Sequence, residues 1–156
     1  MAGNPSSSFD RRTFHVIHDG ETTLTRGIRS TGNQTVKQDM TDFELGLFVG
    51  ILIGEGHFGG DGRQAQITLR MHTDHEALFR WVLRTLPQGG RLYGPYEHGG
   101  RRYYQWMARG PYLRDVLVPI LDRTMSPSID EKSFRRYRAM KERYRLPDTL
   151  LTGAPE

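Results

Sequence analysis

The sequence predicts an α+β domain in which helices alternate with pairs of strands. Three observations predict this class: an apolar segment at residues 45–54 behind a helix-capping signal, an alternating strand at residues 64–71, and a second helix followed by a second hairpin. The 156 residues suit one compact domain. We place it at residues 41–145, between an N-terminal extension at 1–40 and a C-terminal tail at 146–156.

The composition is that of an ordinary globular chain with a basic balance. The chain is 36% hydrophobic and 26% charged, with a net charge of +4 and a pI of about 9.6. Such a balance favours an acidic partner, nucleic acid first. Because there is no cysteine, disulfides, cysteine–zinc sites and cysteine nucleophiles are excluded.

The sequence also predicts where the protein acts. Residues 1–12 lack the apolar core of a signal peptide, and no apolar run approaches the ~20 residues of a membrane helix. We therefore expect no membrane partner and an intracellular location, either the cytoplasm or nucleoid of a microbe or an organelle.

The first helix of the domain has a clear start and an unusual surface. Thr41 and Glu44 form a capping-box pattern, and Gly56 sits where a left-handed residue commonly ends a helix. Glycines recur at every fourth position, so they lie close to one helix face and allow another helix to approach. That second helix belongs either to another copy of the chain or to the same monomer. The recurring positions are Gly46, Gly50 and Gly54.

The remaining elements follow in a regular order. We expect a turn at residues 59–62, a half-buried strand with Gln64, Gln66, Thr68 and Arg70 on its polar side, and a second helix behind a capping box from Thr73 to Glu76. A second hairpin turns near residues 98–100, a helix starts at Pro111, and a basic helix occupies residues 128–146. In the extension, residues 12–29 suggest a hairpin and residues 30–39 a linker.

The segment "FVGILIGEG", Phe48–Gly56, resembles the signature of the LAGLIDADG homing endonucleases. The resemblance covers roughly residues 41–145 and includes "GGRLY" at 89–93 and "VPILD" at 118–122. It implies the αββαββα fold of that family, with a saddle-shaped antiparallel sheet. One departure is Ile53, where the family often has an earlier acidic residue; the later acidic position is kept as Glu55.

The resemblance implies a homodimeric, site-specific DNA endonuclease that makes metal-dependent double-strand breaks at a long, near-palindromic site, as in intron homing. A single motif per chain implies that the dimer forms through the glycine-bearing helix. The residues that this assigns to the dimer interface are Gly46, Leu47, Gly50, Ile51 and Gly54.

The resemblance also assigns the chemistry. Glu55 and the Gly54 carbonyl would hold Mg²⁺, or another divalent cation such as Mn²⁺, because two neighbouring carboxylates repel each other until a cation neutralises them. His72 would orient water or take a proton, and Lys132, with Arg123 as the alternative, would stabilise phosphate charge. The alternatives are a solvated glutamate at a helix end, a surface histidine and a solvated lysine.

The same resemblance implies that the polar face of the sheet reads DNA in the major groove. Gln66 and Arg70 suit bidentate contacts to adenine and guanine, whereas a plain solvent-facing surface is the alternative. The basic helix carries several cations that spread around it, so only some of them would contact phosphates. They are Lys132, Arg135, Arg136, Arg138, Lys141, Arg143 and Arg145. The residues assigned to DNA binding are Gln64, Gln66, Thr68, Arg70, Arg91, Tyr93, Arg101, Tyr103 and Gln105.

Two other functions fit the same residues. One is a relative that recognises DNA without cutting it, for which Glu55 is dispensable. The other is an RNA-splicing helper, which would bind structured RNA more tightly than duplex DNA. The retained Glu55 favours the endonuclease.

Overall fold

The computed structural model describes residues 40–86 and 88–149. The predicted hairpin at 12–29, the linker at 30–39 and residues 150–156 lie outside this part of the chain. Along the described residues the elements are α1 (Asp42–Glu55), β1 (Gly56–Gly60), β2 (Ala65–His72), the 3₁₀ turn η1 (Thr73–His75), α2 (Glu76–Thr85), β3 (Arg91–His98), β4 (Arg101–Arg109), α3 (Gly110–Tyr112), the π-helical turn η2 (Leu113–Leu117), α4 (Val118–Thr124) and α5 (Glu131–Tyr144).

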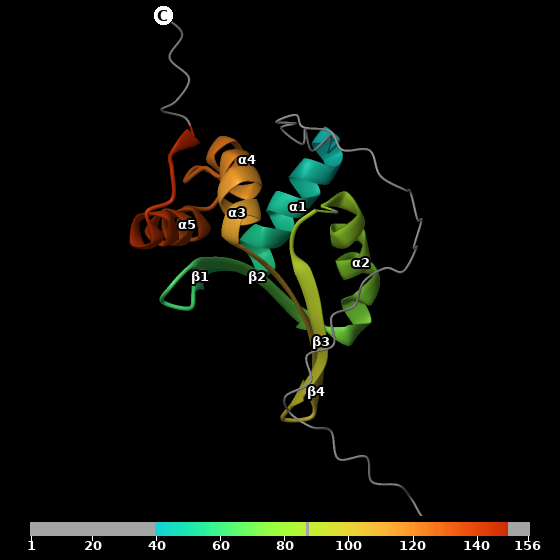
Figure 1. The fold of residues 1–156 in the computed structure, drawn as a ribbon. Coiled ribbons are helices and arrows are strands. Elements are labelled where there is room, and N and C mark those ends of the chain that lie inside the picture. Colours follow the sequence, from blue (N-terminus) through green and yellow to red (C-terminus); the bar gives the residue numbers. More distant parts are fainter. Residues whose placement is uncertain (1–39, 87, 150–156) are drawn as a thin grey trace, which may run out of the picture.

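The α+β class is confirmed, with one four-stranded antiparallel sheet in the order β1-β2-β4-β3. The helices cover one face of this sheet and leave the other face open (Figure 1). Strand β2 shows the reason, because its burial alternates along the strand and every second side chain is buried. The expected turn near residues 98–100 joins β3 to β4.

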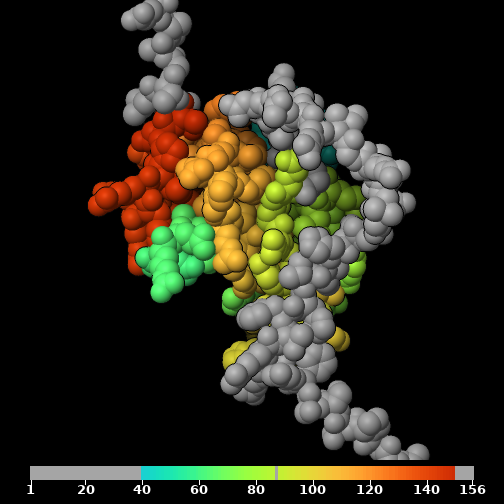
Figure 2. Space-filling model, viewed as in Figure 1, coloured from blue at the N-terminus to red at the C-terminus, as the bar shows by residue number. Residues whose placement is uncertain are grey.

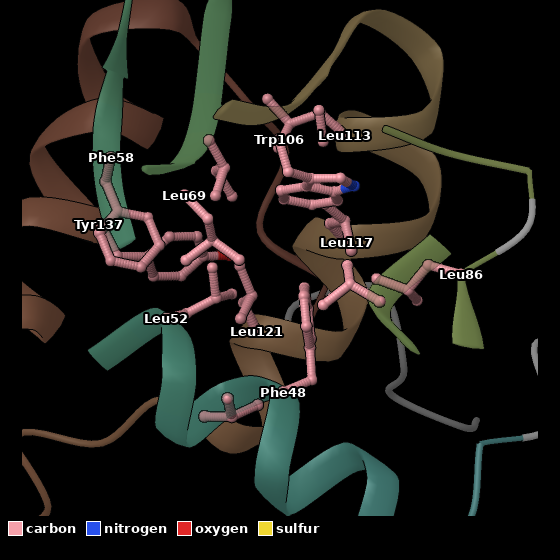
Figure 3. Packing of buried hydrophobic residues seen from close by; sticks show 14 of the residues in the cluster. Phe48, Leu52, Phe58, Leu69, Leu86, Trp106, Leu113, Leu117, Leu121 and Tyr137 are labelled. Atoms are coloured by element: carbon pink, nitrogen blue, oxygen red, sulfur yellow. The ribbon is translucent and has the colours of Figure 1, made fainter. Parts of the chain in front are cut away.

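The core lies between the sheet and the helices. Phe48 of α1 packs edge-on against Trp106 of β4, with ring centroids 5.9 Å apart. Leu52, Leu69 and Leu121 surround them and are fully buried (Figure 3). Each such side chain contributes about 1.5–3 kcal/mol by leaving water. The core therefore fixes α1 on the sheet through only one side of the helix.

Helix α1 begins as predicted. The Thr41 hydroxyl accepts the Glu44 amide hydrogen, and the Glu44 carboxylate accepts the Thr41 amide hydrogen at 2.9 Å. Its end differs from the prediction, because Gly56 is extended, with φ −77° and ψ 147°, rather than left-handed. A Cβ at Gly56 would lie 2.3 Å from the Leu52 carbonyl oxygen. Glycine is needed there for close approach as the helix passes directly into β1.

The turn predicted at residues 59–62 is also shifted. Gly59 and Gly60 belong to strand β1, and a Cβ at Gly60 would lie 2.4 Å from the Tyr144 ring. The Tyr144 hydroxyl accepts the Gly62 amide hydrogen at 3.1 Å. The β1–β2 turn, green in Figure 2, consequently lies beside α5, in red.

The helix predicted to start at Pro111 contains a wide turn. Pro111 occupies the first turn of α3, and the chain continues through the π-helical turn η2 into α4. Pro119 follows η2 and has no amide hydrogen, so the regular hydrogen-bond ladder is interrupted at this point. Leu113, Leu117 and Leu121 still face the core.

Among the basic residues of α5, Lys141 is not available for DNA phosphates. The Lys141 side chain is only 3% exposed, and its ammonium group donates to Asp122 at 2.6 Å and also to Asp148. Residues 146–149 thus lie against α4 and α5, where Thr149 donates to Asp122. A buried lysine requires such partners, and α4 and the segment after α5 supply them.

Candidate DNA interface and metal site

A groove of about 610 Å³ runs along the side of α1 that the core leaves uncovered. It brings the predicted dimer residues together with Glu55 and His72. Its lining residues are Gly46, Leu47, Gly50, Ile51, Gly54, Glu55, Arg70, Met71, His72, His75 and Leu78. The groove therefore has an apolar floor from α1 and a polar end where α1 meets β2.

The three recurring glycines in this groove are not required by packing among the described residues. A Cβ at Gly46, Gly50 or Gly54 would meet nothing within 4 Å, in contrast to Gly56. On the same helix, Phe43 is 74% exposed. Close helix packing inside the monomer, the alternative explanation of the glycines, has no support in this part of the chain.

Glu55 ends α1 at the polar end of the groove. It is exposed and makes no hydrogen bond or ion pair with any described residue. The last turn of α1 contains no basic side chain, and the negative end of the helix dipole disfavours a carboxylate there. This carboxylate therefore has no directly bonded cation or donor within the described chain.

The backbone next to Glu55 offers further oxygen atoms. The last carbonyls of a helix have no helical partner. Here the Leu52 carbonyl accepts the Gly56 amide hydrogen and the Ile53 carbonyl accepts the Ser133 hydroxyl at 3.2 Å, which leaves the Gly54 carbonyl beside Glu55. A carboxylate and a carbonyl are the oxygen ligands that Mg²⁺ and Mn²⁺ accept.

One copy of the described chain does not complete a metal site. No group of three or more histidine, cysteine, aspartate or glutamate side chains gathers in residues 40–86 and 88–149. Mg²⁺ usually takes only one or two carboxylates and completes its shell with water and phosphate. Glu55 and Gly54 fit such a cation if a second copy and DNA supply the other ligands.

His72 stands at the end of β2 in the groove, as expected, but with a local role that the sequence did not reveal. Its Nδ1 accepts the Asp74 amide hydrogen at 3.2 Å and so caps η1. The capping box predicted from Thr73 to Glu76 is therefore wrong, because Thr73 lies inside η1 and α2 begins at Glu76 without a side-chain cap.

This hydrogen bond determines which nitrogen of the neutral His72 ring carries the hydrogen. When Nδ1 accepts the amide hydrogen, the ring proton is on Nε2, which becomes a donor. Nδ1 also lies 3.1 Å from the Asp74 carboxylate, a contact that requires a hydrogen on Nδ1. The two contacts therefore need different states of Nδ1, an acceptor for the amide and a donor for the carboxylate. The neutral form suits orienting a water or phosphate oxygen rather than taking a proton.

Lys132 lies at the start of α5, which is tied to the end of α1. Besides its bond to the Ile53 carbonyl, Ser133 donates its amide hydrogen to Asp130 at 2.6 Å. Lys132 precedes Ser133 and is exposed, although it does not line the groove. Arg123, the alternative, is exposed on α4 and has no such link to α1. The geometry favours Lys132.

The open face of the sheet carries the predicted polar side chains. Alternation puts Gln66, Thr68 and Arg70 of β2 on this face, and their cross-strand partners in β4 are Arg109, Met107 and Gln105. Trp106 is in the core, as expected. The predicted residues Arg91, Tyr93, Arg101 and Tyr103 share this face through the β3–β4 register.

Five residues of the open face were not predicted from the sequence, and His98, opposite Arg101, is one of them. His57 lies opposite Thr68 on β1, and an alternating pattern from Glu55 was its only signal. Tyr96 was missed because the register shifts between Tyr93 and Tyr96. Met107 and Arg109 continue the alternation of Tyr103 and Gln105. Alternation in "RRYYQWMAR" is weak in the sequence because its buried and open positions both hold aromatic residues.

The far end of the open face is hollowed. Gln64, Arg91, Tyr93 and Arg109 line a cavity of about 470 Å³ beside the start of α3. Three of these were predicted DNA contacts, and the cavity brings two guanidinium groups together without an acidic lining residue. Such a surface is suited to a polyanion.

No model of a known protein family matches the chain, and no curated protein is similar to it. In the described part of the chain, no helix has both the length and the apolar character to cross a membrane. The resemblance to LAGLIDADG endonucleases therefore depends on the motif and on the order of the elements.

Proposed function

We propose that the protein is a homodimeric, site-specific DNA endonuclease of the LAGLIDADG type, with its αββαββα fold and saddle-shaped sheet. One observation carries the proposal: α1 presents glycines with no packing use inside the described chain, and the same face ends on an unpartnered Glu55. An enzyme that needs two carboxylates near a two-fold axis accounts for both features.

The dimer follows from the apolar groove. Leu47 and Ile51 line it beside the glycines, and a second α1 related by a two-fold axis would cover the same residues in both copies. Glycines allow the two backbones to approach, as small-residue stripes do between other helices. The two Glu55 side chains would then lie near the axis, one from each copy.

The chemistry follows from the groups around that axis. A bound Mg²⁺ would lower the pKa of a water molecule and stabilise the leaving 3′ oxygen. Glu55 and the Gly54 carbonyl would hold the cation, the Nε2 hydrogen of neutral His72 would orient a water or phosphate oxygen, and Lys132 would reduce the negative charge on the phosphate.

The substrate follows from the open sheet face. It carries arginines, glutamines and tyrosines without a carboxylate among the residues assigned to it, so it suits the acceptor-rich major groove. Because a homodimer presents this face twice, the site would be near-palindromic and long. The proposed substrate is double-stranded DNA inside the cell.

A randomised DNA library tests the proposal. The purified full chain is incubated with the library and Mg²⁺, and both the bound fragments and the new ends are sequenced. The same reaction is run with Glu55→Gln and with EDTA. We expect ends at one near-palindromic site from the wild type only, since losing a metal ligand costs several kcal/mol of barrier, at least about a hundredfold in rate.

Two other results would reject the enzyme. If wild type and Glu55→Gln enrich the same sequence and neither makes ends, the protein recognises DNA without cutting it. If structured RNA competes better than any enriched duplex, the protein is an RNA-binding helper. Glu142→Gln on the exposed side of α5 is the matched control for removing one negative charge.

A further inference from the structure

On the open sheet face, neighbouring side chains fix the orientation of Arg70 before any ligand arrives. Arg70 of β2 lies directly opposite Gln105 of β4. Its Nε and one Nη donate to the Gln105 side-chain oxygen at 3.2 and 2.7 Å. The guanidinium carbon stands 5.1 Å from the centre of the Tyr103 ring, and Tyr103 packs on Tyr96 with centroids 5.4 Å apart.

These contacts hold one edge of the guanidinium group and leave the other edge available. A guanidinium group has five N–H donors, and Gln105 uses two of them. The three that remain include the adjacent pair on the two Nη atoms, which is the pair that binds two acceptors side by side. Arg70 has no carboxylate partner among the described residues, unlike Arg114, which pairs with Asp115 at 2.7 Å.

We propose that Arg70, held by Gln105 and Tyr103, reads a guanine close to the cut in each half-site. This deepens the proposed function and depends on it. An arginine offers donors only, and guanine is the base that presents two acceptors, O6 and N7, on its major-groove edge. Adenine and cytosine each present an amino group there, which a guanidinium group rejects.

The position of Arg70 determines where this guanine lies. Arg70 lines the groove together with Glu55 and His72, and it is two residues from His72 along β2, about 7 Å. Successive bases on one strand are about 3.4 Å apart. The guanine therefore lies within about three base pairs of the scissile phosphate, and the two-fold axis repeats it in the other half-site.

The same geometry changes the role assigned to Gln105. Its side-chain oxygen accepts from Arg70, so we assign Gln105 the role of positioning Arg70. Gln66 is constrained differently, because its amide nitrogen donates to Asp61 at 3.0 Å, within the β1–β2 turn. Gln66 lies near the start of β2, whereas Arg70 lies near its end.

Selection from random DNA with Mg²⁺ tests this assignment, using the full-length wild type, Arg70→Lys, Arg70→Gln and Gln105→Ala. We expect the wild type to prefer guanine at one central position per half-site by roughly 5- to 100-fold, the range of one bidentate contact. Arg70→Lys should lose that preference, and Arg70→Gln should shift it toward adenine. Gln105→Ala should reduce it without altering preferences elsewhere in the site.

The control is Arg102→Lys, an exposed arginine that alternation puts on the opposite side of β4; it should match the wild type. If Arg70→Lys keeps the guanine preference, the inference is wrong. If Arg70→Lys weakens all sequences equally, Arg70 contacts a phosphate and the inference is also wrong. If the wild type enriches no site, the proposed function fails, and this inference fails with it.

Discussion

Two regions of the molecule treat charge in opposite ways. Between α4, α5 and residues 146–149, the charged side chains of Asp122 and Lys141 are buried and paired. We name Asp122, Tyr137, Lys141, the partly exposed Asp148 and Thr149 the Asp122 cluster. Along the uncovered side of α1, Glu55 and an apolar groove have no partner among the described residues. The two regions therefore differ in the source of their partners. The Asp122 cluster finds them in the described chain, whereas Glu55 and the groove do not.

The Asp122 cluster shows what a completed charged site requires. Burial alone would raise the pKa of Asp122, but hydrogen bonds from Lys141, Thr149 and Tyr137 outweigh it and lower the pKa to about 2. Burial, followed by the hydrogen bond to Asp122, raises the pKa of Tyr137. A carboxylate removed from water is tolerated because several donors replace the lost hydration.

Glu55 has no such hydrogen-bond donors among the described residues, and its surroundings show what the site still needs. Its groove is lined by Leu47, Ile51 and Met71, so covering it would bury apolar area but would also bring charge near charge. A second copy supplies the apolar cover, and a divalent cation with DNA phosphate supplies the charge balance. We therefore expect residues of the same chain to complete the Asp122 cluster, and a second copy, a cation and DNA to complete the site on α1.

The largest expected effect comes from breaking the cluster. Lys141→Met should lower the free energy of unfolding by about 3–5 kcal/mol, because it leaves the buried Asp122 carboxylate without its cation. Guanidinium denaturation followed by circular dichroism measures it. Lys132→Met, an exposed lysine on the same helix, should change stability by less than about 0.5 kcal/mol. Equal losses would show that the cluster is not the stabilising feature.

Lowering the pH should destabilise the Asp122 cluster by a smaller amount than Lys141→Met does. The pKa of Asp122 is 3.8 in its ordinary state and about 2 in the fold. Its contribution is therefore present above pH ~4–5 and is lost as the pH falls toward 2, by about 2 kcal/mol in total. Unfolding curves at pH 6, 4 and 3 should show this decline, and Asp122→Asn should flatten it. An unchanged slope in the variant would contradict the assignment.

Gly50→Ala tests the other region. In a single copy the new methyl group meets nothing within 4 Å, so helix propensity should raise monomer stability by about 1 kcal/mol. Between two α1 helices the same methyl group should weaken the dimer. Denaturation of dilute protein and sedimentation equilibrium measure the two effects separately. If both stability and association increase, the glycines do not face a partner helix.

The smallest expected effect is at the junction of α1 and α5. Ser133→Ala removes the hydrogen bond to the Ile53 carbonyl and should cost only about 0.5 kcal/mol of stability. Lys132, which precedes Ser133, would then be held less firmly relative to α1, so DNA cleavage should fall more than stability does. Comparing kcat with the unfolding midpoint checks this. A loss of activity that merely follows stability would make Ser133 a structural residue only.

The sequence predicted elements whose signals are local. Thr41 and Glu44 marked the start of α1, and period-two alternation identified β2 and its polar face. The left-handed helix end expected at Gly56 was wrong, and the helix cap by His72 and the burial of Lys141 were not predicted. All three depend on tertiary neighbours: a helix carbonyl, the Asp74 amide, and carboxylates on α4 and in the segment after α5. No local pattern encodes these contacts.

The residues of the candidate site also fall into those that a local pattern predicts and those that depend on tertiary contacts. Glu55, Gly54 and the glycines were identified from the motif, and the fold brings them together with His72 in one groove. The hydrogen bond between Arg70 and Gln105 joins residues 35 positions apart. Tyr96 lies on the open face because the β3–β4 register shifts before it. Pairing across strands, which the sequence does not specify, decides both.

Cross-linking through α1 tests the central claim most directly. The chain has no cysteine, so Leu47→Cys introduces a single thiol into the groove, and Glu142→Cys on α5 provides an exposed control. Both variants are treated with a short bifunctional maleimide at micromolar concentration and then assayed on DNA with Mg²⁺. The account predicts a covalent dimer from Leu47→Cys alone, which still cuts DNA. A chain that stays monomeric, or cross-links no faster than Glu142→Cys, would contradict it.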